Sequence, residues 1–112
     1  MTTAFADEAL RIRSVAGLND ELIARGTGAA RSTVRGWLSR RSAPTGVRAE
    51  RVGELSALVD RLPRVMENDY IPVWLTKPIE ALDDEKPIDL IGRGEYRRVA
   101  RIVSELEDPG AV

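Results

Sequence analysis

The sequence predicts an all-α protein, with a helical bundle in residues 1–62 and a smaller helical domain in residues 63–112. Three observations support this. Apolar residues recur three or four positions apart through most of the chain, as on one face of a helix. Gly and Pro separate these stretches. No segment alternates as a strand does, and PVWL at 72–75 is too short to classify. A chain of 112 residues suffices for one domain, or for two very small ones sharing a core.

The front of the chain predicts three helices. The first carries an apolar face that Gly17 ends, made of Phe5, Ala9, Ile12 and Ala16. Asn19 is expected to cap a second, short helix that ends near Gly26, and acidic residues in its first turn suit the helix dipole. The third runs from about residue 30 to residue 39, and SRRSAPTG then forms a loop.

The rest of the chain predicts four more helices, two of them short. The fourth begins near Val47 and must end or kink at Pro63. Pro78 and Pro87 are expected in the first turns of the two short helices. The last runs from Glu95 to about residue 107 and stops before Pro109-Gly110. Its expected buried face consists of Tyr96, Val99, Ile102, Val103 and Leu106.

The composition argues against catalysis. Cys and His are both absent, which removes the thiolate nucleophile, the commonest general base and the commonest metal ligands. The acidic cluster at 83–85 lacks the ligand spacing of a calcium loop and is interpreted as a solvated loop. We therefore expect no enzyme activity, no cofactor and no metal. Without an apolar run of ~20 residues or a signal peptide, the expected location is the cytoplasm.

Charge divides the chain unevenly. Residues 1–52 hold nine Arg and five acidic residues, a net charge of +4, whereas residues 53–112 hold eight Lys or Arg and thirteen acidic residues, a net charge of −5. A basic front and an acidic back suggest two different partners, and the alternative interpretation is that both are ordinary solvated faces.

Residues 23–41, IARGTGAARSTVRGWLSRR, have the pattern of a helix-turn-helix. Ala24 is small where two helices cross, Gly28 suits the tight turn, and Val34 and Trp37 face the core. The second helix of such a motif enters the DNA major groove with its N-terminal end. The residues expected to reach bases or phosphates are Arg31, Ser32, Thr33, Arg35, Arg40 and Arg41.

The stretch resembles the Xre-type helix-turn-helix, in which a small residue, Gly, a branched aliphatic residue and often Trp hold these positions. It departs from that pattern at Ala30, where the family usually has a capping Ser or Thr. The alternative interpretation is a helical hairpin with a solvated arginine face.

Residues 74–106 resemble the toxin-binding domain of the Xre/MbcA/ParS antitoxin family. The matching features are Trp74-Leu75, Pro78 with Leu82, Pro87 with Leu90-Ile91, Gly94-Glu95, and Val99 with Val103. The resemblance implies an antitoxin that neutralises a RES-domain, NAD-consuming toxin, represses its own operon, and acts as a homodimer within a larger complex. The residues then expected at the toxin are Trp74, Leu75, Tyr96, Arg97, Val99, Val103, Glu107, Asp108 and Val112.

Three interpretations stay open. The first is that antitoxin, whose acidic tail would block the anionic substrate's entry to the toxin. The second is a stand-alone regulator whose back half dimerises or senses. The third is an interaction module whose helix-turn-helix no longer binds DNA. Singly, each apolar residue of 74–106 could also be core, and the tail could be a solvated terminus.

Overall fold

The computed structural model describes residues 4–110, and side chains from Asp7 onward. This part of the chain is all-helical, as predicted, and its only extended pairing is an isolated bridge between Ile79 and Glu85. The elements are α1 (Ala4–Ala16), α2 (Asp20–Thr27), α3 (Arg31–Leu38), α4 (Gly46–Arg61), η1 (Leu62–Arg64), η2 (Asn68–Tyr70), α5 (Ile71–Leu75), η3 (Glu80–Leu82), α6 (Pro87–Gly92) and α7 (Tyr96–Glu107).

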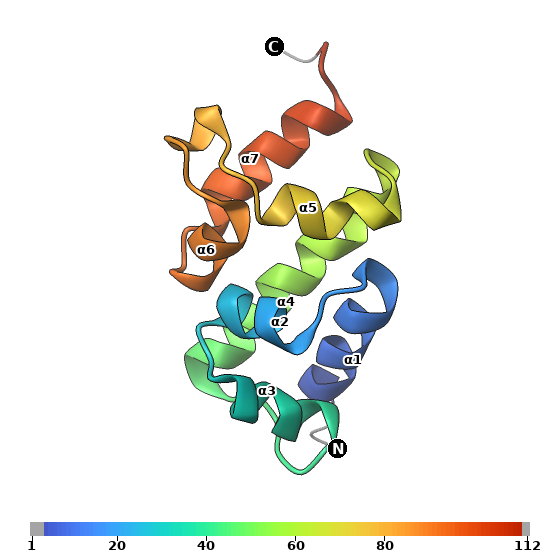
Figure 1. Ribbon diagram of the computed structural model, residues 1–112, viewed down its shortest axis with the longest axis vertical. Helices are drawn as coiled ribbons and strands as arrows, with labels where there is room; N and C mark the ends of the chain where they lie inside the picture. The colour runs from blue at the N-terminus through green and yellow to red at the C-terminus, as the bar shows by residue number, and fades with distance from the viewer. Residues whose placement is uncertain (1–3, 111–112) are drawn as a thin grey trace.

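Helix α4 runs through the middle of the elongated molecule (Figure 1). Helices α1, α2 and α3 gather around one half of it, and α5, α6 and α7 around the other. The molecule measures 44 × 24 × 22 Å. One continuous core connects the two halves, because α2 packs on α6 while α7 packs on α4. The front and rear halves therefore share one hydrophobic core.

The front helices begin and end for the reasons that the sequence indicates. The Asn19 Oδ1 atom accepts a hydrogen bond of 2.9 Å from the Leu22 amide, which caps α2. Gly28, at φ 72°, follows α2 in the left-handed conformation and turns the chain toward α3. Ala30 caps α3 without a side-chain hydrogen bond. The prediction that Phe5 joins the apolar face of α1 lies outside the described side chains.

Two features of the rear half differ from the prediction, and one unclassified segment is now assigned. Pro78 begins no helix, because Ile79 is extended and pairs with Glu85 before the short turn η3 starts. The ambiguous PVWL segment lies in α5, with Pro72 in the first turn, where its missing amide costs no hydrogen bond. Leu106, expected to be buried, is 43% exposed, so the buried face of α7 ends before this residue. Pro87 does start α6, as predicted.

Candidate DNA and partner surfaces

The N-terminal end of α3 is an exposed polar surface. Arg31, Ser32, Thr33 and Arg35 are all exposed, whereas Val34 and Trp37 on the opposite face are buried. This separation follows from helical periodicity, since positions three apart share a face. Helix α2 packs against α3, and its Ala24 is buried. The N-terminal end of α3 therefore presents its polar side chains to solvent.

The basic residues around α3 are held in different ways. The Arg35 Nε atom lies 3.4 Å from a carboxylate oxygen of Asp20, whose other oxygen lies 3.2 Å from Arg13. Arg40 forms an ion pair with Asp7. Arg41 donates a hydrogen bond of 3.1 Å to the Ser39 hydroxyl. Arg31 forms no ion pair with any residue that the structure describes.

The expected toxin contacts divide into buried and exposed groups. Leu75, Val99 and Val103 are fully buried, and Trp74 is only 7% exposed. A side chain buried in the folded chain cannot contact another protein. The expected direct toxin contacts of Leu75, Val99 and Val103 are therefore wrong, and these residues pack in the core. Trp74 likewise serves mainly as core.

Tyr96 is half-buried, while Arg97 and Asp108 are exposed. Glu107 is engaged within the chain, because Arg61 donates to both its carboxylate oxygens at 2.7 and 3.0 Å. These hydrogen bonds hold the pKa of the Glu107 carboxyl below its ordinary value. Val112 lies outside the described residues.

Sequence reasoning missed an apolar surface on α5 and the turn before it. Val73 is 50% exposed and Tyr70 is 39% exposed. The Lys77 Nζ atom donates a hydrogen bond of 3.1 Å to the Tyr70 hydroxyl and lies 5.8 Å from the ring centre. The helical spacing of the sequence could have indicated the exposure of Val73. Ile71, Trp74 and Leu75 occupy the inward face of α5, so Val73 points outward.

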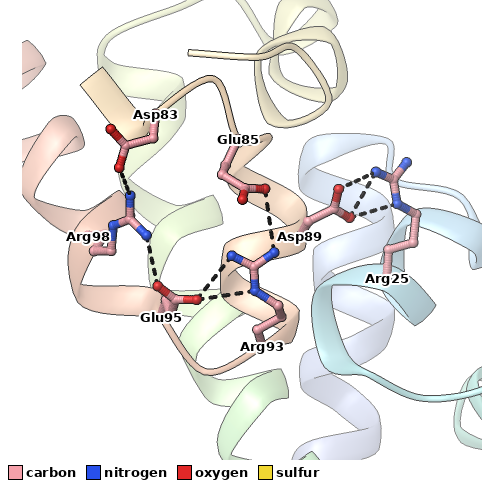
Figure 2. Close-up of polar contacts among 7 residues, drawn as sticks. All are labelled: Arg25, Asp83, Glu85, Asp89, Arg93, Glu95 and Arg98. Carbon is pink, nitrogen blue, oxygen red and sulfur yellow. Dashed lines mark hydrogen bonds and ion pairs between the residues drawn. The ribbon is translucent and has the colours of Figure 1, made fainter. Parts of the chain in front are cut away.

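A chain of ion pairs follows the edge of the rear half (Figure 2). Arg98 bridges Asp83 and Glu95, and Arg93 bridges Glu95 and Glu85, with separations from 2.8 to 3.4 Å. Hydrogen bonds from Arg98 and then Arg93 lower the pKa of the Glu95 carboxyl. Asp83 and Glu85 of the 83–85 loop thus pair with arginines, and the described part of the chain holds no cluster of ligands suited to a metal.

The two halves meet closely where α6 packs on α2. Arg25 donates three hydrogen bonds of 2.9–3.1 Å to the carboxylate of Asp89 (Figure 2). A Cβ atom on Gly92 would lie only 2.0 Å from the Arg25 carbonyl oxygen, and one on Gly28 would lie 3.2 Å from the Gly92 carbonyl oxygen. Only glycine therefore permits the backbones to approach this closely.

The chain is similar to known proteins in both sequence and fold. No family model matches the chain. The chain is 29% identical over 92 residues to the mycobacterial cidal antitoxin MbcA of Mycobacterium bovis and of Mycobacterium tuberculosis, covering 82% of this chain and 81% of the relative. Its fold matches a chain of the M. tuberculosis MbcT–MbcA toxin–antitoxin complex with a TM-score of 0.82, at 27% identity over 96% of both chains. No helix among residues 4–110 is long and apolar enough to cross a membrane.

Proposed function

We propose that the chain is the antitoxin of a toxin–antitoxin pair and neutralises a protein toxin by binding it. The observation that carries this proposal is the similarity to MbcA, which extends over most of the sequence and nearly all of the fold. The absence of Cys and His supports a role in binding rather than catalysis. The resemblance of residues 74–106 to the Xre/MbcA/ParS family supports a RES-domain, NAD-consuming enzyme as the toxin.

The proposed toxin-binding surface consists of accessible side chains of the rear half. Arg97, Asp108 and the half-buried Tyr96 belong to it. We add Tyr70 and Val73, because exposed aromatic and aliphatic side chains are typical of protein interfaces.

The experiment is co-expression with the adjacent gene, followed by co-purification. Val73→Asp should weaken the complex, because it places a carboxylate in an apolar contact. Val47→Asp is the matched control, since Val47 is also exposed but lies at the start of α4 in the front half. Failure of the wild-type chain to co-purify would contradict the proposal, and equal retention by both variants would contradict the surface.

The tail beyond α7 is proposed to block the toxin's active site, with Asp108 and Val112 among its residues. An acidic tail suits a pocket that accepts the pyrophosphate of NAD. Truncation after Glu107 leaves the ion pair with Arg61 in place, so the shortened chain should still bind. It should inhibit NAD consumption poorly, and full inhibition would show that the folded part alone blocks the toxin.

We further propose that the chain represses its own operon through α3. The exposed end of this helix supports that role, with Arg31, Ser32, Thr33 and Arg35 at the bases and Arg40 and Arg41 at phosphates. A homodimer would read half-sites about 34 Å apart, or a multiple of that. Arg31→Ala with Arg35→Ala should abolish operator binding and leave toxin neutralisation intact.

A stand-alone transcription regulator is the second candidate, favoured by the same exposed end of α3. Under it, the chain binds DNA at a measurable affinity but forms no complex with the product of the adjacent gene. DNA-binding and co-purification measurements on the same preparation distinguish the two candidates.

A further inference from the structure

A groove runs between the α2–α3 turn and the end of α6, with a volume of about 560 Å³. One wall belongs to the helix-turn-helix and carries Arg25, Gly28 and Arg31. The other wall belongs to the rear half and carries Gly92 and Arg93. The groove therefore joins the end of α3 that faces DNA in our proposal to a residue of the half that faces the toxin.

The two walls hold a fixed separation. Gly92 packs directly on the Arg25 carbonyl. The Arg25 side chain donates hydrogen bonds to both carboxylate oxygens of Asp89. Arg93 follows immediately after α6, so its backbone is placed relative to Arg31 by this contact. The residue therefore loses little backbone freedom on binding.

The accessible charge of the groove is positive. It is lined by three arginines, Arg25, Arg31 and Arg93, against Glu21 and Asp89, a net charge of +1, and Arg25 and Asp89 pair with each other. Arg31 forms no ion pair with described residues, and the Arg93 side chain is 48% exposed while it pairs with Glu95 at 3.0 Å and Glu85 at 3.4 Å. Beyond the turn, Arg48 donates to the Gly28 carbonyl at 3.2 Å and adds a further cation.

We propose that Arg93 contacts a backbone phosphate of the duplex whose major groove receives α3. A planar guanidinium recognises a phosphate through paired hydrogen bonds. This inference rests on the proposed DNA binding by α3. It assigns a DNA contact to the rear half, which otherwise carries a net negative charge.

The experiment measures affinity for a labelled duplex from the region upstream of this reading frame, across a salt series and without toxin. Arg93→Gln should weaken binding and reduce the slope of log affinity against log salt by about 0.9, the value for one lost phosphate contact. Arg93→Lys keeps the charge and should retain most of the slope. Arg101→Gln, an exposed change on α7 with the same loss of charge, should leave the slope unchanged.

Glu85→Gln serves as a second variant, because it removes one carboxylate that competes for Arg93. It should bind DNA at least as tightly as the wild-type chain. An unchanged slope in Arg93→Gln, with wild-type DNA binding present, overturns this inference alone. A wild-type chain that does not bind the duplex overturns the DNA-binding proposal and this inference together.

Discussion

At Ala30, the helix proposed to read DNA begins without a side-chain cap. The residue already has the extended backbone of a capping position, at φ −74° and ψ 154°. Ala30→Ser should therefore place a hydroxyl near the free amides of the first turn and stabilise the chain by about 1 kcal/mol. Denaturant unfolding measures the gain.

Ala57→Ser is the matched control for this prediction. Ala57 is exposed in the middle of α4, where every backbone amide already has a partner. The same substitution there should destabilise the chain by a few tenths of a kcal/mol, because Ser is a poorer helix former than Ala. A loss of stability at Ala30→Ser as well would show that the start of α3 is not limited by its cap.

At the scale of the elements, the contact between α6 and α2 depends on Gly92. In Gly92→Ala, the new methyl group would overlap the Arg25 carbonyl oxygen, so one of the two backbones must move. We expect a loss of about 1–3 kcal/mol, the usual cost of overpacking, or more because the obstacle is backbone. Thermal or denaturant unfolding measures it.

Gly53→Ala provides the opposite expectation. Gly53 lies inside α4 and a Cβ atom there would meet nothing within 4 Å. The substitution should stabilise the chain by roughly 0.5–1 kcal/mol, since alanine favours the helix. If both alanine variants were equally stable, the close approach of α6 to α2 would not exist in solution.

The end of α7 is attached to α4 through Glu107 and Arg61. Arg61 lowers the pKa of Glu107 below its ordinary value of 4.5, so the stability that this pair contributes is present above pH 4.5 and lost as the pH falls through the lowered pKa. Glu107→Gln should therefore melt below the wild-type chain at neutral pH, and the difference should narrow in acid. Glu105→Gln, an exposed change on the same helix, should show no such dependence on pH.

Several helix ends could be predicted from sequence because caps and prolines act locally. Asn19, Gly28 and Pro87 each terminate or start a helix through their own backbone or side-chain chemistry. Pro78 has the same chemistry as Pro87, yet the following residues pair across a loop instead. Leu106 continues an apolar stripe past the point where the core offers a partner. Both differences depend on tertiary packing, which no local pattern contains.

At the scale of the whole molecule, the shared core should make unfolding a single cooperative transition. Trp37, 2% exposed, lies in the front half, and Trp74 lies in the rear half of the same cluster. Variants with one tryptophan, Trp37→Phe and Trp74→Phe, should each give the same midpoint by fluorescence as by circular dichroism. Two separate midpoints within one variant would mean that the halves unfold independently.

The candidate surfaces were only partly predictable from sequence, because they too depend on tertiary packing. A polar residue on the outer face of an amphipathic helix, such as Arg31 or Arg97, can be placed outside from the sequence. An apolar residue such as Val99 fits a core and an interface equally well. Arg93 carries no distinguishing signal at all, because its neighbourhood with Arg31 arises only when α6 packs on α2.

The close approach of Gly92 to the Arg25 carbonyl limits which front and rear halves can be combined in one gene. Recombination between related genes can exchange one half of a chain for another, as a way to acquire a new operator or a new partner. Here a foreign front half would have to bring a helix that tolerates Gly92 at contact distance and a cation opposite Asp89. We therefore expect hybrid genes joined near residue 62 to fail, and the two proposed specificities to descend together as one unit.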